Sequence, residues 1–189
     1  MKILLIDNYD SFTYNLFHLL EQYPNAEVEV KRSDEIDPEG LQNYNAFVLS
    51  PGPGLPSESA MLLKLTRDCI NTGKVLGVCL GHQALAEVRG AKLKNLHKVH
   101  HGLSLKTNVM QGDDPLFRNI PENFMTGRYH SWVIDPTSLP EEIRIIATDD
   151  EGNVMAIKYV HKPVWGIQFH PESILTEYGK ELIFNWLDA

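Results

Sequence analysis

Hydrophobic positions follow two periods in the part of the chain that precedes Gly90. Apolar or alternating runs predict strands at residues 1–6, 28–30, 46–49 and 75–79. Between them, apolar residues recur every three or four positions, which predicts helices over residues 12–23, 61–69 and 81–87. Asp10 and Ser11 are expected to cap the first of these helices. Strands that alternate with helices in this way indicate a parallel, doubly wound sheet.

The pattern changes after Gly90. Alternating apolar residues at 103–109, 143–145 and 155–159 predict antiparallel strands laid onto the first half. A buried strand is expected at 164–169, and a terminal helix is expected from its apolar stripe of Leu182, Ile183, Trp186 and Leu187. We treat residues 1–189 as a single α/β domain.

Composition limits the classes of function. The 189 residues carry 17 Lys and Arg against 25 Asp and Glu, a formal charge of −8 that disfavours nucleic acid as a partner. The most basic stretches, 92–98 and 158–162, contain few aromatic residues. The early apolar run at 3–6 is too short for a membrane span or a signal peptide. Two cysteines do not make a disulfide framework, so we expect a reducing, cytoplasmic location.

The segment Gly77-Val78-Cys79-Leu80-Gly81 joins a predicted strand to a predicted helix. Glycines two positions on either side of Cys79 permit the sharp turn of a nucleophile elbow, with Cys in the Ser position. The N-terminus of the helix that follows favours the thiolate form of the cysteine. The elbow alone leaves open that Cys79 is a small buried core residue, and Cys69 is expected to be one because it lies on an apolar helix face.

A cysteine nucleophile needs a base, and His170-Pro171-Glu172 directly follows the last predicted strand. Pro171 favours an extended backbone, in which His170 and Glu172 share one face. Glu172 can then orient His170 and stabilise its imidazolium, as the third member of a triad does. The alternative is a surface histidine beside an ordinary acidic residue.

A rigid loop, Ser50-Pro51-Gly52-Pro53-Gly54-Leu55-Pro56, follows the strand at 46–49. Proline lacks an N–H group, so the glycines offer the unhindered backbone donors that an oxyanion site requires. The amide of Leu80, which follows the nucleophile, is the expected second donor. In isolation the same loop is compatible with an ordinary tight turn.

Three histidines, His97, His100 and His101, lie close together in the sequence. No Cys or carboxylate stands near them at ligand spacing, so a metal site is disfavoured.

Together, the motifs 77–83 (Gly-Val-Cys-Leu-Gly-His-Gln), 168–173 (Gln-Phe-His-Pro-Glu-Ser) and 49–54 (Leu-Ser-Pro-Gly-Pro-Gly) resemble those of the class I, or triad, glutamine amidotransferases. The resemblance implies a flavodoxin-like fold: a central, mostly parallel sheet flanked by helices, with a small added antiparallel sheet. The opening at 7–16 resembles the glutaminase subunits of chorismate-using synthases, and Tyr129-His130-Ser131-Trp132 resembles the family's Tyr-His-Ser segment, with Trp in place of an aliphatic residue.

What the resemblance implies is the hydrolysis of L-glutamine through a cysteine thioester. Its catalytic residues would be Cys79, His170 and Glu172, with the amides of Leu80 and Gly54 forming the oxyanion site. The positions that would hold glutamine are Gly52, Pro53, Gly54, Gln83, Ser131 and Trp132.

The released ammonia would pass to anthranilate synthase component I or to aminodeoxychorismate synthase component I. No cofactor is expected on this chain, and any Mg²⁺ would belong to the synthase. The stretch 93–105 departs most from the family pattern, in a region that often faces the partner.

Two other hypotheses of function remain. One is a free-standing cysteine hydrolase acting on γ-glutamyl compounds, which the opening at 7–16 and Gln83 disfavour. The other is a non-catalytic subunit that keeps the fold, which the complete set of Cys79, His170 and Glu172 disfavours.

Overall fold

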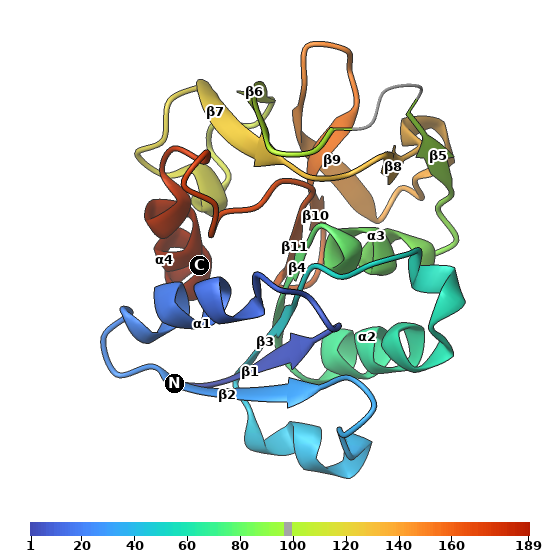
Figure 1. The fold of residues 1–189 in the computed structure, drawn as a ribbon, viewed down its shortest axis with the longest axis vertical. Helices are drawn as coiled ribbons and strands as arrows, with labels where there is room; N and C mark the ends of the chain where they lie inside the picture. Colours follow the sequence, from blue (N-terminus) through green and yellow to red (C-terminus); the bar gives the residue numbers. More distant parts are fainter. Residues whose placement is uncertain (97–99) are drawn as a thin grey trace.

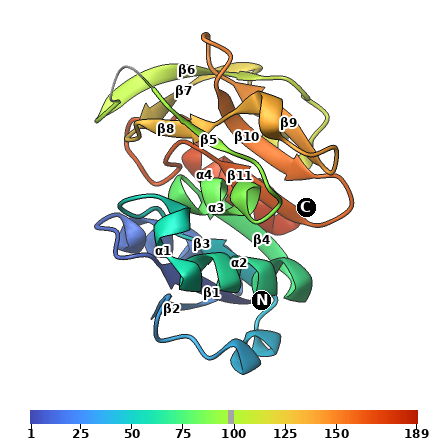
Figure 2. The same ribbon diagram turned by 90° about the vertical axis from the view of Figure 1, so that its right-hand side faces the viewer.

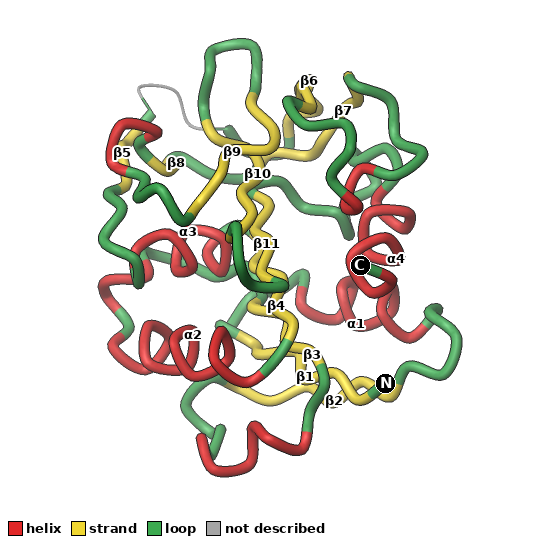
Figure 3. The backbone as a smooth tube through the Cα atoms, turned by 180° about the vertical axis from the view of Figure 1, so that it is seen from behind, coloured by secondary structure: helices red, strands yellow, loops and turns green. Residues whose placement is uncertain are grey.

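A computed structural model describes residues 1–96 and 100–189. Its core is a nine-stranded sheet in the order β2-β1-β3-β4-β11-β10-β9-β6-β7. The first five strands of that order are parallel: β2 (Glu27–Arg32), β1 (Lys2–Asp7), β3 (Ala46–Leu49), β4 (Lys74–Val78) and β11 (Val164–Ile167). Figure 3 shows this twisted ladder of strands running through the middle of the molecule.

In the described part of the chain, four α-helices cover the two faces of the parallel strands (Figure 1). They are α1 (Thr13–Glu21) and α4 (Gly179–Asp188) on one face, and α2 (Ala60–Thr72) and α3 (Leu80–Glu87) on the other. Short 3-10 helices span Pro38–Asn43, Pro56–Glu58, Pro115–Phe117 and Pro136–Ser138. No helix within the described residues is long and apolar enough to cross a membrane.

Strand β3 explains how the two hydrophobic layers form. All four of its residues are buried, because successive side chains of a strand point to opposite faces and both faces are covered. Ala46 and Val48 pack in the layer that contains Leu16 and Trp186, from α1 and α4. Phe47 and Leu49 pack in the layer that contains residues of α2 and α3. The predicted parallel sheet with helices is therefore confirmed.

The second half of the chain differs from the prediction in its arrangement. Strands β10 (Val154–Tyr159), β9 (Ile143–Thr148) and β6 (Leu103–Val109) are antiparallel, as expected, but they continue the main sheet edge to edge instead of lying on the first half (Figure 2). Strand β7 (Asn123–Arg128) completes that edge and was not predicted. A separate two-stranded antiparallel sheet pairs β5 (Leu93–Asn95) with β8 (Trp132–Ile134).

The start of α1 also differs from the prediction. Phe12 occupies the N-cap position and makes no side-chain cap, so neither Asp10 nor Ser11 is the cap residue. The Asp10 carboxylate instead accepts a hydrogen bond from the Phe12 backbone N–H at 2.7 Å. The same turn is fixed to β1, because Thr13 Oγ1 donates to Asp7 Oδ1 at 2.7 Å. The Asp10 carboxylate thus holds the turn that places Phe12.

Candidate active site

Cys79 sits between β4 and α3 in a backbone conformation that side chains rarely adopt, with φ +51° and ψ −100°. Both flanking glycines are required by close backbone approaches. A Cβ at Gly77 would collide with the backbone of Gly81, and a Cβ at Gly81 would collide with the backbone of Leu49 on β3. The elbow is therefore pressed against the neighbouring strand, which holds the Cys79 side chain at the carboxyl edge of the sheet.

His170 and Glu172 follow β11, the strand next to β4, and so reach the same edge. His170 Nδ1 lies 2.6 Å from Glu172 Oε1, and both side chains are almost completely buried, at 3% and 0% exposure. The backbone carbonyl of His170 accepts a hydrogen bond from Thr176 Oγ1. The carboxylate thus fixes the Nδ1–H tautomer and leaves Nε2 for chemistry.

The charge state of His170 depends on its two neighbours. Burial acts to lower its pKa, but hydrogen bonds and charges from Cys79 and Glu172 outweigh burial and hold the pKa well above the ordinary value. Glu172 contacts this imidazole directly, at 2.6 Å, and the Cys79 elbow follows the neighbouring strand β4. A nucleophile, a base and an orienting carboxylate are brought together from residues that are 91 positions apart in sequence.

Aromatic side chains restrict the His170 ring. Tyr129 packs edge-on at 4.9 Å between ring centroids, and Phe12 does the same at 5.8 Å. The Tyr129 hydroxyl lies 3.0 Å from Ser173 Oγ, next to Glu172. Sequence reasoning did not assign these contacts, because no periodicity links Phe12 to residues near the far end of the chain.

The loop after β3 lies against the elbow. A Cβ at Gly52 would come within 2.7 Å of the Asn8 carbonyl oxygen and of the Leu80 side chain, so only glycine fits there. Gly54 has φ +74°, in the left-handed region that favours glycine. Glu58 Oε2 accepts a hydrogen bond from the next backbone amide, that of Leu55, at 2.9 Å, which ties down the end of the loop.

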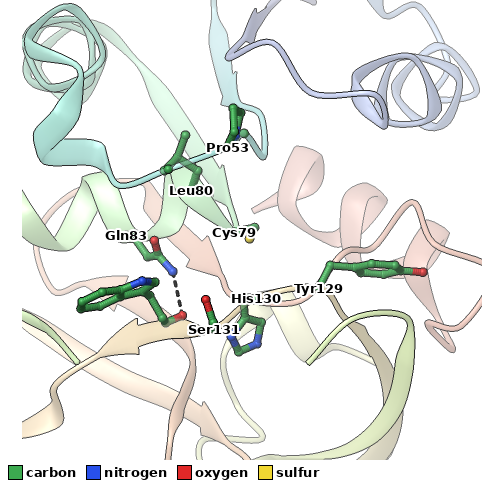
Figure 4. A pocket seen from close by; sticks show the side chains of 10 residues that line it. Pro53, Cys79, Leu80, Gln83, Tyr129, His130 and Ser131 are labelled. Atoms are coloured by element: carbon green, nitrogen blue, oxygen red, sulfur yellow. Dashed lines mark hydrogen bonds between the residues drawn. The ribbon is translucent and has the colours of Figure 1, made fainter. Parts of the chain in front are cut away.

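These elements enclose a cavity of about 190 Å³. Drug-sized ligands occupy pockets of roughly 300–1,000 Å³, so this cavity suits a smaller molecule. Figure 4 shows the Cys79 sulfur facing the cavity, with Pro53 and Leu80 on one side of it and Ser131 and His130 on the other. The lining residues are Gly52, Pro53, Gly54, Cys79, Leu80, Gln83, Tyr129, His130, Ser131 and Trp132.

Every position predicted to hold substrate or form the oxyanion site thus borders one cavity, and Tyr129 and His130 are additions to that set. Burial lowers the pKa of His130 to about 3, helped by the nearby charge of Arg128, so this ring is neutral at neutral pH. The ring of His130 also packs edge-on against His100. His130 therefore adds a neutral imidazole to the wall of the cavity.

Two glutamines link the cavity wall to the nucleophile. Gln83 Nε2 donates to the backbone carbonyl of Trp132 at 2.9 Å, drawn as a dashed line in Figure 4, and to Gln168 Oε1 at 3.0 Å. Gln168 Nε2 in turn donates to Cys79 Sγ at 3.5 Å. The sequence prediction includes Gln168 only as part of a motif, and the available signal is its place directly after the buried strand β11, two residues before His170.

The histidine cluster considered for metal binding is described only in part, because His97 lies outside the described residues. Within residues 1–96 and 100–189, no group of three or more His, Cys, Asp or Glu side chains is arranged to hold a metal ion.

A family model described as "Glutamine amidotransferase class-I" matches residues 4–189, nearly the whole chain. The chain belongs to the class I glutamine amidotransferases. As in the sequence prediction, the chain is a glutamine amidotransferase and has the architecture expected of that family.

Several relatives of this amidotransferase are similar over its whole length. Anthranilate synthase component 2 of Cyanophora paradoxa is 41% identical over 99% of this chain and 98% of its own. Aminodeoxychorismate/anthranilate synthase component 2 of Bacillus subtilis is 37% identical over 99% of this chain and 96% of its own. The bifunctional protein TrpGD of Thermotoga maritima is 38% identical, but this chain spans only 32% of it.

Among solved structures, a glutamine amidotransferase from Thermotoga maritima superposes with a TM-score of 0.73 at 20% identity, covering 100% of this chain and 81% of that one. At this identity the likeness establishes the shared fold of this amidotransferase and not its substrate.

Proposed function

We propose that this chain is the glutaminase subunit of a chorismate-using synthase, which hydrolyses L-glutamine at Cys79 and delivers ammonia to its partner. The observation that supports it most directly is that Cys79 borders a small cavity and that the buried His170–Glu172 pair follows the strand next to its elbow. A thiol on a strained elbow beside an oriented imidazole suits nucleophilic attack on an amide carbon.

In the first half of the proposed reaction, the Cys79 sulfur attacks the side-chain amide carbon of glutamine. The oxyanion that forms would accept hydrogen bonds from the backbone amides of Leu80 and Gly54, which border the same cavity. The raised pKa of His170 keeps its imidazole protonated at neutral pH, so it can give that proton to the amide nitrogen as the C–N bond breaks and ammonia leaves. A γ-glutamyl thioester remains on the sulfur.

In the second half, His170 is neutral and removes a proton from a water molecule that attacks the thioester carbon. The C–S bond breaks, glutamate leaves, and the sulfur and His170 return to their starting charges. Glu172 holds the Nδ1–H throughout at 2.6 Å, which stabilises the imidazolium whenever it forms. The Gly52–Gly54 loop, Gln83, Ser131 and Trp132 would position glutamine over the sulfur.

The partner we propose is anthranilate synthase component I, with tryptophan biosynthesis as the pathway. This proposal is supported by full-length relatives named anthranilate synthase component 2. The alternative is aminodeoxychorismate synthase component I, for folate biosynthesis, or service to both synthases. The Bacillus subtilis relative, which carries both names, and a Klebsiella aerogenes relative named for aminodeoxychorismate synthase support this alternative.

A free-standing γ-glutamyl hydrolase is a remoter alternative. The proposed function also includes two further expectations: that the protein acts in the cytoplasm, and that it needs no cofactor of its own, any Mg²⁺ being bound by the synthase.

The test is to purify the chain with each candidate synthase and to assay glutamine hydrolysis and chorismate amination together. We expect glutamine to support product formation only with the cognate synthase, and Cys79→Ala to remove glutamine use while free ammonia still works. Hydrolysis of γ-glutamyl peptides at a rate that does not change when a synthase is added would overturn the proposal.

A further inference from the structure

The orientation of the Gln83 and Gln168 side chains is fixed by one backbone carbonyl. The Trp132 carbonyl oxygen can only accept, so Gln83 must present its NH₂ group to it. The same NH₂ group donates to Gln168, which must therefore present its oxygen to Gln83. That choice leaves the Gln168 NH₂ group on the other side, directed at the Cys79 sulfur.

Burial makes these contacts chemically significant. Gln168 is fully buried and Gln83 is 3% exposed, so both amides are removed from bulk water. A hydrogen bond of this kind is stronger inside a protein than in water, and more so when one partner is charged. Gln168 also lies two residues before His170, so one segment directly after β11 supplies both the amide that contacts the sulfur and the imidazole proposed as the base.

We propose that Gln168 is a catalytic residue whose amide N–H stabilises the Cys79 sulfur as thiolate and as leaving group, and that Gln83 is a positioning residue that orients this amide. The inference rests on the proposed function, because it assigns roles in the same glutaminase reaction. It also gives Gln83 a task besides holding substrate. Since a hydrogen bond to a charged group is lost, removing the Gln168 donor should lower kcat/KM by about 10- to 100-fold.

The decisive measurement is the rate at which iodoacetamide alkylates Cys79, followed by mass spectrometry as a function of pH in the complex with its synthase. Cys69 does not interfere, because it is fully buried and burial raises its pKa. We expect Gln168→Met to move the alkylation profile to higher pH and to slow alkylation at pH 7 by about 10-fold. Its loss in glutamine turnover should fall mainly on kcat, with little change in KM.

Two further variants distinguish the loss of the hydrogen-bond donor from a general disturbance of packing. Gln168→Glu keeps an oxygen that can accept from Gln83, yet an ionised carboxylate cannot donate to the sulfur, so the profile should still move to higher pH. Asn185→Leu is the matched control, because Asn185 is a buried amide on α4 that donates to the carbonyls of Leu116 and Arg118. It should lower stability and leave the alkylation profile unchanged.

A double-mutant cycle tests the role of Gln83. Gln83→Met should shift the profile in the same direction by less, and adding it to Gln168→Met should produce no further shift. An alkylation profile of Gln168→Met that matches the wild type, in a complex that hydrolyses glutamine, overturns the inference. Additive shifts in the cycle overturn the positioning role of Gln83. Failure of the wild-type complex to hydrolyse glutamine would instead overturn the proposed function.

Discussion

The molecule has two buried cysteines in opposite surroundings. Cys69 lies on the inner face of α2, fully buried in a hydrophobic layer with Leu65 and Phe47. Cys79 is 8% exposed, lies on a strained elbow, borders a small cavity and helps to raise the pKa of His170. Burial raises the pKa of Cys69 and favours its neutral thiol, as it does for any group that ionises to an anion.

The difference shows that burial alone does not decide whether a thiol is reactive. Cys69 has apolar neighbours, so burial only removes water from it. Cys79 is nearly as buried, but the Gln168 amide N–H donates to its sulfur, and Cys79 is among the groups that raise the pKa of His170. The following predictions test this comparison, from the largest expected effect to the smallest.

Cys79→Ala should remove glutamine-dependent product formation, by roughly 10⁵-fold or more, because no other group on the elbow can form the thioester. Ammonia-dependent product formation by the complex should persist. Steady-state assays with each nitrogen source measure both. Loss of the ammonia-dependent reaction as well would show that Cys79, like Cys69, has a structural role.

Glu172→Gln should lower kcat/KM by about 10³- to 10⁴-fold. The new amide can donate to His170 Nδ1, which would move the ring proton to Nε2 and leave no base facing Cys79. Steady-state kinetics of glutamine hydrolysis would measure this loss, with circular dichroism to verify folding. A loss below tenfold would show that the 2.6 Å contact does not set the tautomer.

The pKa of His170 should be lower in Cys79→Ala than in the wild type. Burial lowers this pKa, whereas the hydrogen bond and charge of Cys79 are among the interactions that raise it. Removing them should therefore lower the pKa of His170. NMR titration of labelled histidine rings would follow it. In the wild type, His170 should stay protonated well above the pH at which an ordinary histidine loses its proton. Equal midpoints in the two proteins would show that thiol and imidazole do not interact.

Cys69→Ser should change kcat/KM by about twofold or less and lower the free energy of unfolding by about 1–3 kcal/mol, because a hydroxyl replaces a thiol in an apolar layer. Chemical denaturation and steady-state kinetics measure the two effects. A large loss of turnover with stability intact would mean that the reactive thiol had been assigned to the wrong cysteine.

The sequence predicts the parallel half well because its elements have regular hydrophobic patterns. The run at Ala46–Leu49 is apolar and buried throughout, and the stripe that ends at Leu187 recurs at helical spacing, so each pattern identifies its element. The family resemblance implies the small antiparallel sheet, but the hydrophobic pattern does not locate its strands β5 and β8, because three residues are too few to show a period. Strand β7 escaped prediction because its Gly127 and Asn123 disfavour a strand on propensity alone.

The site likewise has features that the sequence predicts and features that it does not. Motif spacing predicts the cavity residues. The spacing of Gly77, Cys79 and Gly81 follows from the sharp local turn of the elbow, so it can be recognised in the sequence. The contacts of Phe12 with His170 and of Gln83 with Gln168 join distant segments, and only the packed fold shows them. The direction of the Gln168 amide depends further on the Trp132 carbonyl, a backbone atom that no sequence motif specifies.

The most direct test of the central claim is to label the complex with a glutamine analogue that carries an electrophilic carbon in place of the side-chain amide, and to locate the label by mass spectrometry. The account predicts a single adduct on Cys79, prevented by excess glutamine. An adduct on Cys69, an adduct that excess glutamine does not prevent, or no adduct at all would contradict it.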